Sequence, residues 1–225
     1  MTKKEITIAL AGNPNSGKTT VFNNLTGSRQ HVGNWPGVTV EKKEGGCTFK
    51  GHRIRVVDLP GVYSLTAYSL DEVVARDYVV DERPDVVVDV VDASNLERNL
   101  YLAIQFLEMG ANLVIALNMM DVAEARGYQI NVEELSHLLG SPVVPMVAAK
   151  NQGTNALLET VVSVATEETQ VHGINIQYGH DVEAEIAKLE QLIATNSLAQ
   201  QYSPRWLAVK LLEEDKEIIG KIRQA

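Results

Sequence analysis

An eight-residue stretch, Gly12 to Thr19, combines glycines with a lysine and a hydroxyl residue at a spacing suited to phosphate binding. It reads Gly-Asn-Pro-Asn-Ser-Gly-Lys-Thr and fits the pattern G-x-x-x-x-G-K-[ST], between an apolar run and a helical pattern. Glycines let backbone N–H groups turn toward phosphate oxygens, and a helix N-terminus adds a favourable dipole. Lys18 is expected to reach the β- and γ-phosphates, and the Thr19 hydroxyl to bind Mg²⁺. The stretch therefore predicts a nucleoside-triphosphate site.

A second motif, Asp58-Leu59-Pro60-Gly61, ends a predicted strand. By itself the pattern D-x-x-G is typical of an ordinary turn after a strand. At the end of the third strand after a phosphate-binding loop, it predicts that Asp58 holds Mg²⁺ through water. The Gly61 N–H is then placed to sense the γ-phosphate.

A third motif, Asn118-Met119-Met120-Asp121, also follows a strand. A carboxylate at Asp121 can accept both the ring N–H and the exocyclic amine of guanine, whereas adenine presents no such pair of donors. Asn118 is expected to brace the loop. Residues Ala148-Ala149-Lys150 stand where a base-contacting loop is expected, although this degenerate match alone could equally be a plain loop. Together these motifs predict a guanine-nucleotide site.

Apolar runs that predict strands alternate with amphipathic patterns that predict helices. Strands separated by helices form a mostly parallel sheet with right-handed crossovers, and the one direct strand–strand link implies one antiparallel edge strand. The sequence therefore predicts an α/β, P-loop GTPase fold with a six-stranded sheet flanked by helices. Strands are expected at 6–11, 38–48, 53–59, 85–91, 112–117 and 143–147, and helices at 19–25, 70–80, 96–109, 132–139 and 156–166.

The pattern changes near residue 170. Residues 1–170 are predicted to form the GTPase (G) domain, and the polar, glycine-containing residues 171–180 to form a linker. Residues 181–225 contain two helical patterns, 182–195 and 204–223, with no strand between them. A small all-α domain is therefore expected after the G domain.

Composition limits the functional classes. The net charge is −9, and residues 171–225 hold six basic and eight acidic residues, so no basic arm for nucleic acid is present. The single cysteine, Cys47, excludes an intramolecular disulfide and fits a reducing cytosol. No apolar run approaches the ~20 residues of a membrane span. The five histidines show no pair at metal-ligand spacing on one helix, so no iron site is assigned to this chain.

The order and spacing of the motifs resemble the translation-factor-like GTPases. Three stretches narrow the resemblance: QHVGNWPGVTVE at 30–41, DLPGVYSL at 58–65 and DASNLERNL at 92–100. They look like the N-terminal cytosolic domain of the bacterial ferrous-iron transport protein B (FeoB) family, and the resemblance covers essentially the whole chain. It implies a helical domain that acts like a GDP-dissociation inhibitor, and a following membrane domain that these 225 residues lack.

By this resemblance the chain would regulate ferrous-iron uptake at the cytosolic face of the bacterial inner membrane, with possible oligomerisation through the membrane part. The fragment alone is expected to be soluble and cytoplasmic. Thr39 would join the Mg²⁺ shell when GTP is bound, and switch I (about 29–38) and switch II (61–69) would order around the γ-phosphate. The expected nucleotide-contacting residues are Gly12, Asn13, Pro14, Asn15, Ser16, Gly17, Lys18, Thr19, Thr20, Gly37, Val38, Thr39, Asp58, Leu59, Pro60, Gly61, Asn118, Met119, Asp121, Ala148, Ala149 and Lys150.

Val62 stands where many small GTPases carry a water-orienting glutamine, and its side chain offers no hydrogen bond. Resemblance to potassium-activated members implies that the Asn15 side chain helps to bind K⁺, with the carbonyls of Gly33 and Trp35. Hydrolysis is then expected to be slow and potassium-stimulated. Trp35, beside Pro36, is expected to be an exposed residue of the switch loop. The catalytic set is Asn15, Lys18, Thr39 and Gly61.

Two other functions stay open. One is an RNA- or ribosome-associated assembly GTPase, which would need a basic appendage that the acidic tail lacks. The other is a guanine-nucleotide sensor with negligible turnover, which the valine at position 62 makes credible. Met119 replaces a lysine that commonly packs over guanine, and Ala148 replaces a hydroxyl residue, so modest affinity and fast GDP release are expected.

Overall fold

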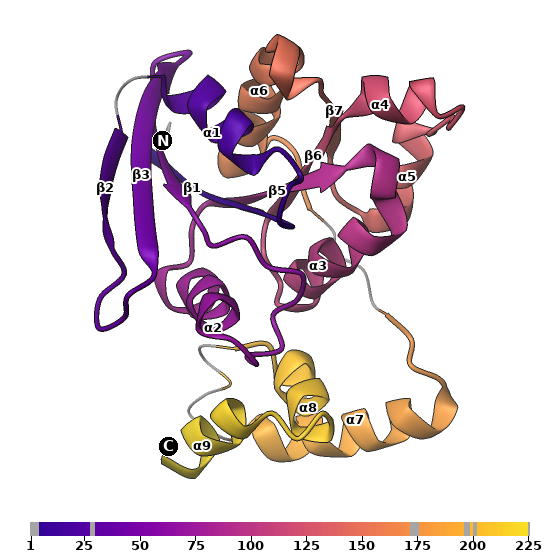
Figure 1. Cartoon of the computed structure of the whole chain (residues 1–225). Helices are drawn as coiled ribbons and strands as arrows, with labels where there is room; N and C mark the ends of the chain where they lie inside the picture. Colours follow the sequence, from indigo (N-terminus) through magenta and orange to yellow (C-terminus); the bar gives the residue numbers. More distant parts are fainter. Residues whose placement is uncertain (1–4, 28–29, 172–175, 196–198, 200–201, 225) are drawn as a thin grey trace.

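The computed structural model describes residues 5–27, 30–171, 176–195, 199 and 202–224. Its larger part is an α/β unit built around one sheet (Figure 1). In chain order its main elements are β1 (Glu5–Gly12), α1 (Lys18–Thr26), β2 (Gln30–Asn34), β3 (Glu41–Phe49), β4 (His52–Asp58), α2 (Leu70–Asp77), β5 (Val86–Asp92), α3 (Leu96–Glu108), β6 (Leu113–Asn118), α4 (Met120–Ala125), α5 (Val132–Leu139), β7 (Val143–Pro145) and α6 (Thr154–Ala165).

The sheet has the strand order β2-β3-β4-β1-β5-β6-β7. The five neighbouring strands β4, β1, β5, β6 and β7 are parallel. At one edge, β3 pairs antiparallel with β4, and β2 pairs antiparallel with β3. The predicted fold class is confirmed, but the predicted strand number of six was wrong. The seventh strand is β2, which lies in the predicted switch I and pairs with β3 so that Gly33 is opposite Lys42. Arg29, the first predicted switch I residue, lies outside the described residues.

Two apolar layers cover the two faces of the sheet. On one face, α1 and α6 pack through residues such as Phe22 and Leu157. On the other, α2, α3 and α5 pack through residues such as Ala75, Phe106 and Leu139. Because central parallel strands are buried on both faces, their sequences are continuously apolar, as in β1 and β6. The layers fix the carboxyl ends of β1, β4 and β6, where the sequence motifs begin.

The C-terminal part is helical and consists of α7 (His180–Ile193), α8 (Pro204–Leu212) and α9 (Lys216–Gln224). The prediction of one helix over 204–223 was wrong, because the chain turns between α8 and α9. Glu214 has a φ of 56°, which ends α8, and the Asp215 carboxylate accepts the N–H groups of Glu217 and Ile218 at the start of α9. Trp206, Leu207 and Ile218 lie in the apolar centre of this part.

Buried charge connects the two parts. Arg76 of α2 is fully buried, and its guanidinium donates to the carboxylates of Asp215 (3.0 Å) and Glu217 (2.6 Å). A second connection joins the Tyr178 hydroxyl, before α7, to the Glu108 carboxylate at the end of α3. The domain limits 1–170, 171–180 and 181–225 stay predictions, and 172–175 lie outside the described residues. In the described part of the chain, no helix has the length and apolarity needed to cross a membrane.

Candidate nucleotide-binding site

The loop from Gly12 to Gly17 joins β1 to α1 at the carboxyl end of the sheet. Gly12 has a φ of 152°, and an added Cβ would lie 2.8 Å from both Ser16 Oγ and the Val90 carbonyl oxygen. Gly17 has a φ of 89°, and its Cβ would collide with the Asn118 amide. Both positions therefore require glycine. The buried Ser16 hydroxyl and the buried Asn13 amide have no hydrogen-bond partner, so this loop holds polar groups able to meet a ligand.

Lys18 and Asp58 are brought together at the ends of α1 and β4. The Lys18 ammonium donates to the Asp58 carboxylate, which is 8% exposed. Burial raises the pKa of Asp58, while the positive charge of Lys18 opposes that rise. Thr19 follows Lys18 in the first turn of α1 and is exposed. A hydroxyl and a carboxylate beside an ammonium form a donor set that fits Mg²⁺ with a phosphate.

Asn118 connects its own loop to the phosphate loop and to the loop at Ala148. Its Nδ2 donates to the Ser16 carbonyl oxygen, and its Oδ1 accepts from the Ala148 N–H, both at 2.9 Å. The side chain is buried, so each lost bond would leave a buried backbone group unpaired. The phosphate loop and the loop at Ala148 are therefore held at a fixed separation.

The two groups expected to contact the base lie side by side. Asp121 and Lys150 form an ion pair of 2.8 Å, and both side chains remain partly exposed. The hydrogen bond from Lys150 lowers the pKa of the Asp121 carboxyl, which keeps it ionised. Met119 has a φ of 60° and caps the N-terminus of α4, a short helix that the sequence did not predict. The Asp121 carboxylate, a hydrogen-bond acceptor, thus lies outside the sheet, beside the loop that Asn118 braces.

Switch I is not brought to this site. Residues 35–40 form the loop between β2 and β3, which lies apart from the β1–α1 loop in Figure 1. Thr39 and Gly37 are exposed there, and Val38 is half-buried. Gly33 lies within β2, and the Trp35 carbonyl oxygen accepts from the Val38 N–H (3.3 Å).

The expectation that Trp35 is exposed was wrong. It is 7% exposed, because its ring packs edge-on against Tyr78 at 5.2 Å and the Lys42 ammonium lies 4.7 Å from its centroid. Tyr78 follows α2, far from Trp35 in the sequence, so no local pattern indicated this contact. The indole thus anchors switch I on Tyr78, directly after α2.

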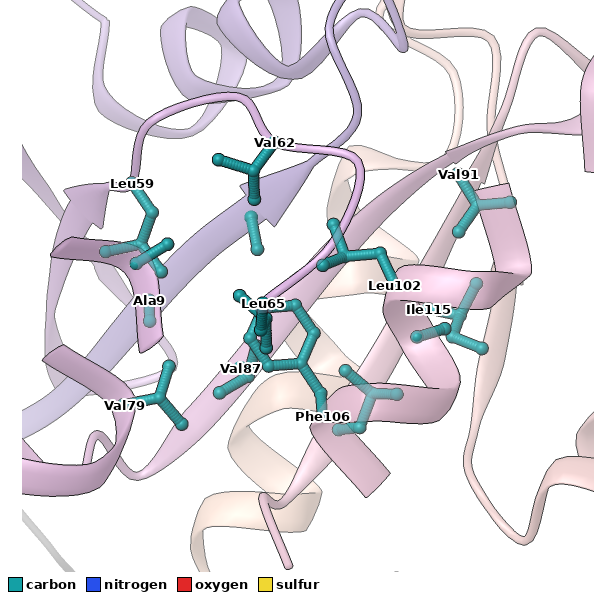
Figure 2. Close-up of a cluster of buried hydrophobic side chains, with 14 of the residues drawn as sticks. Ala9, Leu59, Val62, Leu65, Val79, Val87, Val91, Leu102, Phe106 and Ile115 are labelled. Carbon is teal, nitrogen blue, oxygen red and sulfur yellow. The ribbon is translucent and has the colours of Figure 1, made fainter. Parts of the chain in front are cut away.

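Switch II begins at the site and then enters the core. A Cβ added to Gly61 would lie 3.6 Å from the backbone of Pro14, so the two loops are in contact. Leu59 is buried and its N–H donates to the Leu10 carbonyl oxygen (2.9 Å). Val62 points into the apolar layer that Figure 2 shows and is 4% exposed. Its side chain is therefore turned away from the phosphate loop.

The remaining predicted residues lie on these loops or, for Thr20, in the first turn of α1. Pro14 and Asn15 are exposed on the phosphate loop, where Asn15 has a φ of 67°; Thr20, Pro60 and Ala149 are at least partly exposed. One residue that the sequence analysis missed is Asn24 of α1, whose Nδ2 donates to the Ala148 carbonyl oxygen (2.8 Å). Its position one helical turn beyond Thr20 offered the only signal, namely a polar side chain on the α1 face toward this loop.

Comparison with known proteins agrees with this geometry. The family "Ferrous iron transport protein B" matches residues 6–161, and the family "FeoB cytosolic helical domain" matches residues 178–225. The Fe(2+) transporter FeoB of Escherichia coli (strain K12) is 45% identical over 217 residues, which are 94% of this chain and 27% of that protein. The chain therefore spans about a quarter of the length of such relatives.

Solved structures give the same result. The cytosolic domain of T. maritima FeoB in a GDP form has a TM-score of 0.93 at 42% identity, covering 98% of this chain and 86% of that one. The same domain in a GMPPNP form has a TM-score of 0.92 at 42% identity, covering 97% and 85%. With both parts of the sequence and the fold matched, this chain belongs to the ferrous iron transport protein B (FeoB) family.

Proposed function

We propose that this chain binds GTP with Mg²⁺ and hydrolyses it to GDP and phosphate, slowly and with stimulation by K⁺. The observation that carries the proposal is the Asn118 brace, which joins the phosphate loop to the base loop beside Asp121. A glycine-cradled anion site held at a fixed separation from a carboxylate acceptor suits a nucleotide whose base offers two donors. The relatives in GDP and GMPPNP forms support guanine as that base.

The residues divide the work as follows. Lys18 donates to Asp58 in this structure, so its ammonium would have to leave that carboxylate to contact the phosphates. Asp58 and Thr19 would hold Mg²⁺, and Thr39 would join them after switch I moves. The metal ion would neutralise charge that develops on the phosphate oxygens. Gly61, already in contact with the phosphate loop, would present its N–H to the γ-phosphate.

Val62 cannot orient a water, because its side chain lies in the core. A cation would have to supply the missing stabilisation. Asn15 is exposed on the phosphate loop, and the carbonyls of Gly33 and Trp35 would complete a K⁺ site. In the described conformation Gly33 lies in β2 and the Trp35 carbonyl accepts from Val38, so this site requires the hairpin to rearrange.

The family match supports a proposal for the physiological role. The chain would act as a nucleotide switch for a membrane domain that carries Fe²⁺, at the cytosolic face of the bacterial inner membrane, with oligomerisation possible through that domain. Residues 1–170 would be the G domain, and 181–225 a helical domain that stabilises bound GDP. The family match and the acidic tail disfavour the RNA-associated alternative.

The test is GTP hydrolysis by the purified chain with Mg²⁺, in KCl and in NaCl at matched ionic strength. We expect stimulation by K⁺ that Asn15→Ala abolishes, while Asn155→Ala, on the exposed surface of α6, keeps it. Equal and negligible rates in both salts would refute the proposed GTPase activity. The buried Val62 would then favour the second candidate, a guanine-nucleotide sensor, provided that GDP still binds.

A further inference from the structure

Switch II is attached along one face of α3. Val62 and Leu65 are 4% and 1% exposed, and they lie in the same apolar cluster as Leu102 and Phe106 of that helix (Figure 2). Apolar contact keeps these side chains buried in the core, but it is not directional. It leaves the orientation of the peptide groups between them undetermined.

Two directional contacts come from the same helix. The buried Gln105 side chain accepts, through Oε1, the N–H of Leu65 at 2.8 Å. The Arg98 guanidinium lies 4.2 Å from the centroid of the Tyr63 ring. Positions 98, 102, 105 and 106 share one helical face, so a single face of α3 carries the groups that hold Tyr63 and Leu65.

The segment between these contacts is short. Gly61 rests on the phosphate loop at one end, and Leu65 is fixed by Gln105 at the other, with three residues between them. Because Arg98 and Tyr63 are exposed, their contact is weaker than the buried hydrogen bond. The Gln105–Leu65 bond is therefore the main buried polar constraint that α3 places on the path of switch II.

We propose that Gln105 is a positioning residue for GTP hydrolysis: by holding the Leu65 N–H, it keeps the Gly61 N–H directed at the γ-phosphate. This inference rests on the proposed function. Gln105 contacts Leu65, four residues from Gly61, so its effect would pass through the backbone. It should act on the triphosphate state and on turnover, and it should leave GDP binding unchanged.

The test compares Gln105→Met, which keeps the side-chain length and removes the acceptor, with Gln105→Glu, which keeps an oxygen acceptor. Gln191→Met, on the exposed face of α7, is the matched control. Leaving the buried Leu65 N–H unpaired should lower kcat about tenfold in Gln105→Met. The affinity for GMPPNP should fall several-fold, the affinity for GDP should stay within about twofold, and Gln105→Glu should recover most of kcat.

Measurements of kcat, KM, both affinities and the melting temperature distinguish the outcomes. A Gln105→Met variant that loses GDP and GMPPNP affinity equally, with a lower melting temperature, would show a purely structural role and overturn the proposal. So would an unchanged kcat. If the unmodified chain shows no turnover in KCl, the proposed GTPase activity is refuted, independently of the role of Gln105. The ratio of GMPPNP to GDP affinity still decides on Gln105, because an unchanged ratio would overturn it.

Discussion

Asp89 is a carboxylic acid in the middle of the central strand β5, where it is 1% exposed. Val87 and Val91, two residues before and after it, face the layer of α2 and α3, so Asp89 faces the same layer. Its register neighbours are Ala11 of β1 and Ile115 of β6, both apolar. Neither carboxylate oxygen has a hydrogen-bond partner. We therefore predict that Asp89 is neutral in the folded protein at pH 7.

Burial raises the pKa of Asp89 from 3.8 to about 8. The folded protein thus keeps a proton that the unfolded chain releases above pH 3.8. This group's contribution to stability is complete below pH 3.8, falls as the pH rises through this window, and levels off above pH 8. The slope is about 1.4 kcal/mol per pH unit, so the cost at pH 7 is about 4 kcal/mol.

Asp89→Asn removes the titration and keeps the shape. We expect it to stabilise the protein by an amount that grows by about 3 kcal/mol between pH 5.5 and pH 8 and then stays constant. Urea unfolding of both proteins across pH 5.5–8.5 measures the difference. Asp181→Asn, which removes the same charge from an exposed position, is the control. A difference between Asp89→Asn and the parent that is flat with pH would refute a neutral buried carboxyl.

Two further predictions concern the nucleotide. Asn118→Ala should weaken GDP binding by about 30-fold or more, because it unpairs two buried backbone groups, whereas Asn24→Ala, which removes one bond to the Ala148 carbonyl, should cost less. Isothermal titration with GDP compares the two, and equal effects would contradict the brace. In Trp206→Phe, Trp35 is the remaining tryptophan; its emission should shift to longer wavelength with GMPPNP and Mg²⁺ but not with GDP, and no shift would contradict release of switch I.

Much of the site was predictable, because its residues follow strands closely in the sequence. Gly12, Asp58 and Asn118 each end a strand of a parallel sheet, and parallel strands bring their carboxyl ends to one edge. The motif spacing therefore carried three-dimensional information. The hydrogen bond of Asn118 to the Ser16 carbonyl, 102 residues apart, is the clearest example.

The differences between the predictions and the structure have a common cause, which is contact between segments distant in the sequence. β2 has five exposed residues and lacks the alternation of a half-buried strand, so only its pairing with β3 makes it a strand. Trp35 is buried by Tyr78, which lies 43 positions away. Gln105 appeared as one polar residue on an amphipathic helix, and only the path of switch II shows what it binds.

These contacts divide the candidate site into two halves of unequal stability. The phosphate and base loops are held by buried hydrogen bonds of Asn118 and by the glycine contacts, so they should be rigid in every nucleotide state. Switch I is held by an exposed edge strand, by the buried Trp35 ring and by the half-buried Val38 at the same apolar core. Few buried contacts allow local opening at low free-energy cost. If Thr39 has the role proposed above, a nucleotide that brings a γ-phosphate and Mg²⁺ to it would have to break the Trp35–Tyr78 contact, and we expect this contact to contribute to the free-energy cost of switching.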